Sequence, residues 1–156
     1  MHTVVRSLIA GAAGTSALNL ATYLDMAIRA RGASTTPQQA VAKLTDLTDV
    51  SLGDGEQAEN RKEALGSLLG YATGAGAALC YALLAARRRP SRPLGIAALT
   101  ALAMAGSNVP LTALGTTDPR EWPASAWISD AVPHLAYGIT AYAAYELLRP
   151  SRRPSS

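Results

Sequence analysis

Three long stretches without a charged residue constrain the fold of this chain more than any other feature. Residues 7–24, 64–86 and 94–117 contain no Asp, Glu, Lys or Arg. Uncharged apolar stretches of about 18 residues or more are long enough to cross the hydrocarbon core of a bilayer as helices. Charged residues make up only 16% of the chain, against about 25% in typical soluble domains. We therefore expect membrane-spanning helices.

A fourth apolar run, residues 122–148, is interrupted by polar residues. It contains Asp130 and His134, and Glu146 lies near its end. Including this run, the sequence predicts an all-α integral membrane protein, a four-transmembrane-helix bundle that forms a single domain over residues 1–156. The expected spans are about 5–28, 64–86, 94–117 and 122–148.

Two alternative interpretations compete with four retained spans. A soluble Ala-rich helical bundle requires polar helix faces, which residues 72–86 lack. The N-terminal segment, with Arg6 followed by an apolar run, resembles a secretory signal peptide. However, that run continues to Leu24 and is followed by Arg29 and Arg31, which is typical of a retained helix. We therefore expect the first helix to stay in the protein.

Residues 29–63 form a surface loop between the first two spans. Thr36 is a suitable N-cap, and Pro37 then occupies the first helical position. Apolar residues recur after it at helical spacing: Val41, Leu44, Leu47 and Val50. The pattern predicts a short amphipathic helix on the membrane surface. Residues 51–63 are expected to follow as a turn and a polar approach to the second span.

Basic residues predict the orientation in the membrane. With four spans, both termini and the loop 87–93 lie on one side of the bilayer. That side carries eight basic residues: Arg6, Arg87, Arg88, Arg89, Arg92, Arg149, Arg152 and Arg153. The opposite side carries six: Arg29, Arg31, Lys43, Arg61, Lys62 and Arg120. The positive-inside rule therefore predicts that the N- and C-termini are cytoplasmic.

Small residues on two spans indicate close helix packing. In the second span, glycine recurs at every fourth residue: Gly66, Gly70 and Gly74. The first span has a similar face: Ser7, Gly11 and Thr15. In lipid, helices associate through close van der Waals contact, which small residues permit. The contact lies either within the chain or between chains, in a homo-oligomer or with another membrane protein.

Polar side chains inside the spans fall in one half of the predicted bilayer. With a rise of about 1.5 Å per residue, that half faces loops 29–63 and 118–123. Its polar residues are Asn19, Asp25, Tyr71, Asn108, Asp130 and His134. Asp130, His134 and Tyr137 share one helical face because they are spaced i, i+4 and i+7. Ionisable residues in a bilayer cost about 2.5–3.5 kcal/mol each on insertion scales, which makes them candidates for function.

Prolines accompany these polar residues. Pro133 lies next to His134, and Pro110 lies close to Asn108. A proline inside a helix removes one backbone hydrogen bond and favours a kink. The carbonyl groups that it frees need internal partners or water when they lie in lipid. We therefore expect freed backbone acceptors beside the polar side chains.

Three interpretations of the polar residues are open. Asp130 and His134 can pair with each other and with Asn108 only to fix helix register. They can instead form a water-accessible site for a small ligand or ion. They can also take part in a proton-linked process, because an Asp–His pair can titrate near neutral pH.

The sequence contains few residues for cofactor, metal or nucleic-acid chemistry. One Cys and two His are too few for an intrachain zinc or haem site. The sequence has no nucleophile elbow, phosphate loop or HExxH motif, so we expect no cofactor, no metal and no enzymatic activity. The arginines cluster at span ends without interleaved aromatic residues, which argues against nucleic-acid binding.

Three blocks carry a resemblance to a known family: NLATYLDMAIRARGASTTPQQAV (19–41), SNVPLTALGTTDPREW (107–122) and SDAVPHLAYG (129–138). They resemble a group of small four-span membrane proteins of actinobacteria to which no activity is assigned. The VPHLAYG segment is also similar to inner-membrane proteins of the YagU type, which are associated with acid tolerance. The resemblance implies a protein of the bacterial cytoplasmic membrane, and the acid-tolerance link favours a proton-responsive Asp130–His134 pair.

The leading functional hypothesis is a non-enzymatic membrane protein whose polar residues bind or conduct a small solute, ion or proton. The site residues are Asn19, Asp25, Tyr71, Asn108, Asp130, His134 and Tyr137. The alternative is a structural or accessory subunit of a membrane complex that assembles through the small-residue helix faces. The lipid bilayer is the expected partner in both cases.

Overall fold

All regular secondary structure in the described part of the chain is helical. The computed structural model describes residues 2–87 and 89–149. These residues form five α-helices, one short 3₁₀ helix and no strand, which confirms the all-α class. The elements are α1 (Thr3–Arg29), α2 (Thr36–Thr48), α3 (Gly55–Arg87), α4 (Arg92–Ala113), η1 (Pro119–Glu121) and α5 (Ala124–Leu147).

Three of the helices are long and apolar enough to cross a membrane. They are α1 with 27 residues, α3 with 33 and α4 with 22. α5 has 24 residues, but Asp130, Pro133 and His134 lower its mean hydropathy and it does not belong to this set. Length and composition thus identify three candidate spans, compatible with a multi-pass membrane protein.

Two helices end at residues with a left-handed backbone. The C-cap of α1 is Ala30, where φ is 48°, and the C-cap of α2 is Asp49, where φ is 52°. The N–H of Ala30 bonds back to the Met26 carbonyl, as is common at helix C-termini. The turn at Ala30 also brings Arg31 back alongside α1, where its Nε donates to Asp25 Oδ2 at 2.6 Å.

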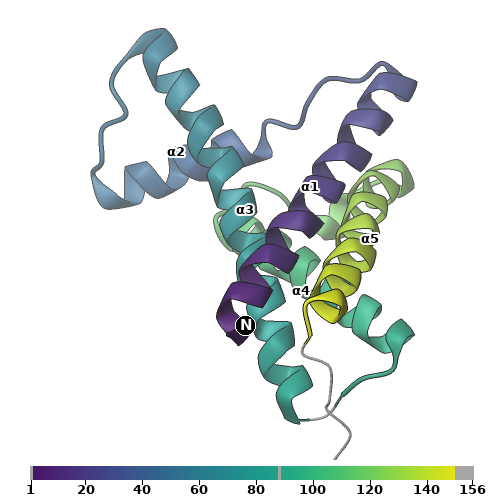
Figure 1. The fold of residues 1–156 in the computed structure, drawn as a ribbon. Helices are drawn as coiled ribbons and strands as arrows, with labels where there is room; N and C mark the ends of the chain where they lie inside the picture. The colour runs from purple at the N-terminus through teal and green to yellow at the C-terminus, as the bar shows by residue number, and fades with distance from the viewer. Residues whose placement is uncertain (1, 88, 150–156) are drawn as a thin grey trace, which may run out of the picture.

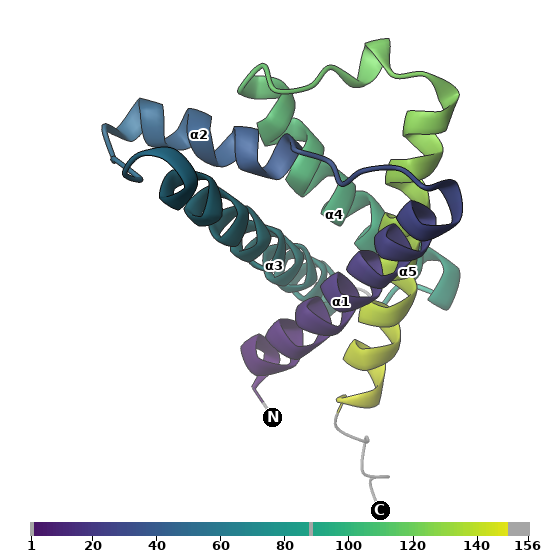
Figure 2. The same ribbon diagram turned by 90° about the horizontal axis from the view of Figure 1, so that it is seen from above.

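The four long helices pack around a shared core. α1 packs on α3 and α5, and α4 packs on the same two helices (Figure 1). α2 lies against α3, outside that core (Figure 2). The start of α1, the end of α3, the start of α4 and the end of α5 lie toward the same end of the molecule (Figure 1). At that end the Arg6 guanidinium lies over the Tyr145 ring, 3.8 Å from its centroid.

The core is built almost entirely from alanine and tyrosine. Its buried residues are Ala10, Ala77, Ala78, Tyr81, Ala82, Ala85, Leu99, Ala103, Tyr137, Ala141 and Tyr145. Small side chains let the helix backbones approach closely. A Cβ on Gly11 would lie 2.6 Å from Ala75 Cα and 2.7 Å from the Gly74 carbonyl oxygen. The contact between α1 and α3 therefore depends on the absence of a side chain at Gly11.

The helix boundaries correct several expectations. Residues 55–63 are the start of α3 and not part of a turn, because this segment is rich in helix-forming residues. α4 ends at Ala113 and α5 begins at Ala124, so the predicted spans 94–117 and 122–148 both lose residues to the connecting loop.

The helix α2 also differs in detail from its predicted form. Its N-cap is Thr35, and Thr36 is its first residue, one position earlier than expected. Of the predicted apolar face, Val41 is buried, whereas Leu44 and Leu47 are exposed. α2 therefore covers α3 with only part of that face.

Gly11→Ala is expected to destabilise the protein, because the new methyl group meets backbone atoms of α3. Overpacking of this kind costs about 1–3 kcal/mol. Gly70→Ala is the matched control, since a Cβ there meets nothing within 4 Å and the gain in helix propensity is the same. Thermal unfolding in detergent, followed by circular dichroism, should give a lower Tm for Gly11→Ala only. Equal Tm values for the two variants would contradict the close approach of α1 and α3.

Candidate functional site

Four polar side chains from α4 and α5 meet near the loop that joins these helices. Asn108 Nδ2 donates to Asp130 Oδ2 at 3.0 Å, and Ser107 Oγ lies 3.3 Å from His134 Nε2. The side chains of His134 and Asp130 are 11% and 18% exposed. We call Ser107, Asn108, Asp130 and His134 the α4–α5 cluster.

The hydrogen bonds of the His134 ring define its tautomer. Nδ1 lies 2.7 Å from the backbone oxygen of Asp130. A carbonyl oxygen can only accept, so Nδ1 carries a proton. Nδ1 also lies 3.4 Å from the carboxylate oxygen Oδ1 of Asp130. The proton that the ring gains or loses is therefore the one on Nε2, which faces the hydroxyl of Ser107.

The hydroxyl of Ser107 can satisfy both protonation states of His134. It can donate to Nε2 of the neutral ring, or accept from Nε2–H of the charged ring. In the second case its own proton has two acceptors, the carbonyl oxygens of Ala103 and Met104, each at 3.1 Å. One rotation of a hydroxyl group therefore accommodates the uptake of a proton without leaving a buried polar group unpaired.

The positions of these groups follow from helical spacing and helix pairing. Asp130 and His134 are one turn apart on α5, and Ser107 and Asn108 lie on the facing part of α4. Pro133 lies inside α5, and the helix continues through it. Its missing N–H leaves the carbonyl of the residue four positions earlier without a helical donor.

α1 supplies charged groups beside the cluster. Arg29 Nη1 donates to Ser129 Oγ at 2.7 Å and lies 3.5 Å from Asp25 Oδ1. Asp25 therefore pairs with two arginines, Arg29 and Arg31. In the described residues it has no hydrogen bond to Asp130, so its link to the α4–α5 cluster runs through Arg29 and Ser129.

Three other predicted site residues lie apart from the cluster. Tyr137 is buried on the same face of α5, but its hydroxyl donates to the Gly74 carbonyl at 2.6 Å. Tyr71 is 40% exposed, and its hydroxyl lies 3.4 Å from Ser16 Oγ on α1. Asn19 is half-buried and makes no side-chain hydrogen bond within residues 2–87 and 89–149. Of the seven predicted site residues, the cluster unites three.

Ser107 and Arg29 belong to the site although the sequence does not single them out. Ser107 directly precedes Asn108 in an uncharged run. Its position next to a predicted site residue is the one feature of the sequence that could have identified it. The sequence identifies Arg29 only as one of the basic residues of the loop 29–63. Its contact with Ser129 joins residues 100 positions apart and depends on the pairing of α1 with α5.

The three glycines of the predicted series in α3, Gly66, Gly70 and Gly74, have different environments. A Cβ on Gly66 would lie 3.0 Å from Pro37 Cβ, on α2. A Cβ on Gly74 would collide with the Thr15 hydroxyl on α1 and would lie 3.2 Å from the Tyr137 ring. At Gly70 nothing lies within 4 Å. Two of the three glycines thus support contacts within the chain, and the third faces open space.

The loop between α4 and α5 is held by local charge-assisted hydrogen bonds. Asp118 accepts from the backbone N–H of Arg120 at 3.0 Å and pairs with its guanidinium at 2.8 Å. The Arg120 guanidinium holds the pKa of Asp118 below its ordinary value of 3.8. Next to them, Trp122 Nε1 donates to Thr117 Oγ1 at 2.8 Å. The loop thus has a fixed conformation at the entrance to α5.

Acid should loosen this loop. Because the folded protein lowers the pKa of Asp118, its contribution is complete above pH 3.8 and is lost as the pH falls below that value. In a Trp127→Phe background, the fluorescence of Trp122 should shift as the pH is lowered through this range. Adding Asp118→Asn should remove the pH-dependent part of the shift. An unchanged acid response in that variant would show that another group controls the loop.

Comparisons with known proteins identify no relative of this chain. No family model, no curated protein and no solved structure matches it. The α4–α5 cluster and the helices that hold it are therefore the basis on which function is inferred.

Proposed function

We propose that this chain is a non-enzymatic, multi-pass protein of the bacterial cytoplasmic membrane whose α4–α5 cluster binds or conducts a small solute, ion or proton. A proton fits the cluster best. The observation that carries the proposal is the ring of His134, which is buried between two helices and has partners for both of its protonation states. Membrane-embedded ionisable groups with such partners are typical of proton relays.

The distribution of side chains on α5 supports a fourth span. The helix is about 36 Å long at 1.5 Å per residue, enough to cross a hydrocarbon core of about 30 Å. Its polar residues His134 and Tyr137 are buried and Asp130 is partly buried, whereas large apolar side chains cover much of its outer surface. The large exposed apolar residues are Trp127, Ile128, Val132, Leu135, Ile139 and Leu147. Such an arrangement suits a helix with lipid on one side and a polar interior on the other.

The charge pattern supports an orientation with both termini in the cytoplasm. Arg6, Arg87, Arg89, Arg92 and Arg149 lie at the end where α1 begins and α5 ends. The other basic residues assigned to this side lie outside the described residues: Arg88, Arg152 and Arg153. The positive-inside rule places this end in the cytoplasm, and the α4–α5 cluster then lies in the outer half of the membrane.

Proton uptake at the cluster follows from its charges. With neutral His134 and ionised Asp130, the pair carries one negative charge. A proton on Nε2 makes the ring an imidazolium, whose charge the nearby Asp130 carboxylate balances. Asn108 donates a hydrogen bond to the other carboxylate oxygen of Asp130, so this carboxylate keeps its position in both protonation states of His134. The side chain of Arg29, 43% exposed, connects this region through Ser129 to the surface of the loop side.

Proton flux and ring titration provide the test. In liposomes with a trapped pH-sensitive dye, the native chain should pass protons under an imposed pH gradient. Asp130→Asn and His134→Ala should reduce the flux to that of empty liposomes. In nanodiscs, the NMR signals of the His134 ring should change with pH, and Asp130→Asn should alter that response.

The control variants distinguish a role of the α4–α5 cluster in proton conduction from a purely structural role in fixing helix register. His2→Ala removes the other histidine, which is exposed at the start of the chain, and should leave the flux unchanged. Ser107→Ala should slow the flux, because Nε2 loses its partner. If the His134 ring does not respond to pH and all variants behave as the native chain, the cluster only fixes helix register and the proposal is wrong.

A second candidate function is that of an assembly subunit. Gly70 supports it, because this glycine belongs to the small-residue series of α3 but has nothing within 4 Å of the position of its missing side chain. Close approach of another helix is what such a glycine permits in lipid. We therefore include a homo-oligomer, or a complex with another membrane protein, as an alternative assembled through this face of α3.

Gly70→Leu should separate such an oligomer into monomers without unfolding the chain, since the added side chain points into open space. Gly76→Leu is the matched control: it is equally open but lies off the Gly66–Gly70–Gly74 face. The measurement is single-molecule photobleaching of labelled protein in liposomes at low density. One bleaching step for the native chain, or equal step numbers for the two variants, would rule out assembly through Gly70.

A further inference from the structure

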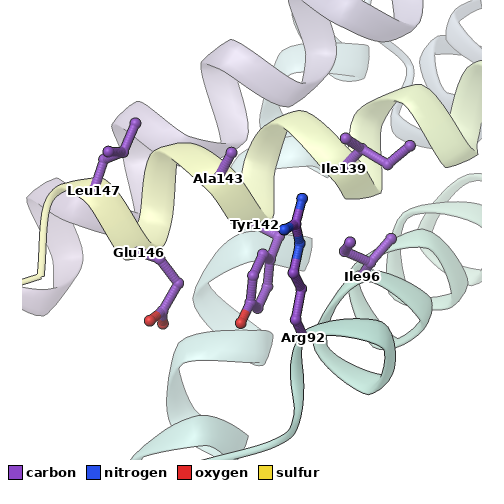
Figure 3. Close-up of a pocket in the computed structure, with 7 residues that line it drawn as sticks. All are labelled: Arg92, Ile96, Ile139, Tyr142, Ala143, Glu146 and Leu147. Atoms are coloured by element: carbon purple, nitrogen blue, oxygen red, sulfur yellow. The ribbon is translucent and has the colours of Figure 1, made fainter.

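A cleft is formed on the outside of α4 and α5 (Figure 3). Its residues come from the start of α4 and the end of α5, the opposite ends of these helices from the α4–α5 cluster. The cleft has a volume of about 460 Å³, within the range of about 300–1,000 Å³ that is usual for ligand sites. Its lining residues are Arg92, Ile96, Ile139, Tyr142, Ala143, Glu146 and Leu147. The cleft thus combines an apolar wall with a few polar groups.

The apolar wall of the cleft belongs to the surface that faces lipid in the proposed membrane arrangement. Ile139 is 47% and Leu147 is 84% exposed. Ile96 from α4 completes the wall (Figure 3). Behind it, the Tyr142 ring packs over Gly95, where a Cβ would collide with the ring, and edge-on against Tyr81. The wall is therefore held in place by the core and is open on the lipid side.

The charged lining residues of the cleft, Arg92 and Glu146, together with Arg89 and Arg149 beside it, carry an excess of positive charge. Glu146 is ion-paired with Arg89 and, at 2.9 Å, with Arg149. Arg92 extends from the start of α4 toward α5 across the cleft (Figure 3). It has no ion pair within the part of the chain that the structure describes. Three arginines against one glutamate leave two positive charges, and one of the three guanidinium groups is available to a ligand.

We propose that this cleft binds one anionic phospholipid. An acyl chain lies along Ile96 and Ile139, and the phosphate diester accepts hydrogen bonds from Arg92. Basic pockets between helices at the membrane surface are suited to such head groups, and guanidinium groups bind phosphate through paired donors. The α4 start and the α5 end bring the head group to the side where the arginines gather.

This inference shares only the membrane placement of α4 and α5 with the proposed function. The cleft does not contain Ser107, Asn108, Asp130 or His134. The variants that test the lipid site therefore leave the α4–α5 cluster intact, and either proposal can fail without the other.

The test is native mass spectrometry of the full chain in detergent, titrated with phosphatidylglycerol or with phosphatidylcholine of the same acyl chains. The native chain should bind phosphatidylglycerol more tightly. Arg92→Gln should lower that affinity about fivefold, the effect expected for one basic residue at a charged membrane surface. Arg92→Lys should keep most of it. Ala143→Trp, on the exposed wall, should fill the cleft and lower the affinity with no change in charge.

Arg120→Gln is the matched control, because this arginine lies at the other end of the helices and pairs with Asp118. It should leave phosphatidylglycerol binding unchanged. Equal affinity for the two lipids, or native affinity in both Arg92→Gln and Ala143→Trp, would overturn the proposal. Inorganic phosphate is added as a competitor: if it displaces phosphatidylglycerol, the cleft recognises a free anion and the lipid assignment is wrong.

Discussion

The contacts that Tyr137 of α5 makes with two other helices, α1 and α3, determine how the rest of the protein is arranged. Its ring, on α5, fills the space left by Gly14 on α1, where a Cβ would lie 2.6 Å from the ring. Its hydroxyl donates to the backbone of Gly74 on α3. A hydrogen bond in lipid contributes only about 0.6 kcal/mol on average, but this one also fixes which face of α5 points inward. Asp130 and His134 share that face, so the same contact directs them toward α4.

The protein places small residues, aromatic rings and polar groups inside and leaves branched apolar side chains outside. Alanine and glycine let α1, α3 and α5 approach closely, and tyrosines fill the remaining volume. The interior is consequently able to hold polar groups whose hydrogen bonds are made within the chain. In water this distribution leaves many apolar side chains unburied, Leu20, Ile28 and Leu83 among them, whereas lipid solvates them at no cost.

The sequence predicted the helices better than the contacts between them. The charge-free stretches identify α1, α3 and α4, because a run of that length without charges leaves few alternatives. The pairing of Asp130 with His134 follows from helical spacing alone. Its partners Ser107 and Asn108 lie on another helix, and their register depends on how α4 packs on α5. Asp25 pairs with Arg31 because the chain turns at Ala30, which has a left-handed backbone conformation. Such a turn is expected at glycine and is not predicted at an alanine.

The length of α3 has a consequence for the proposed membrane arrangement. Its 33 residues span about 50 Å, well beyond a hydrocarbon core of about 30 Å. The length of the uncharged part, residues 64–86, is close to the thickness of such a core. Residues 55–63 continue the helix beyond it. α2 is attached where the two parts meet, through Pro37 and Gly66. A thinner bilayer would increase the tilt of α3, because its hydrophobic stretch would then be longer than the hydrocarbon core, and α2 would move with it across the membrane surface. The position of α2 in the proposed arrangement thus depends on the thickness of the bilayer.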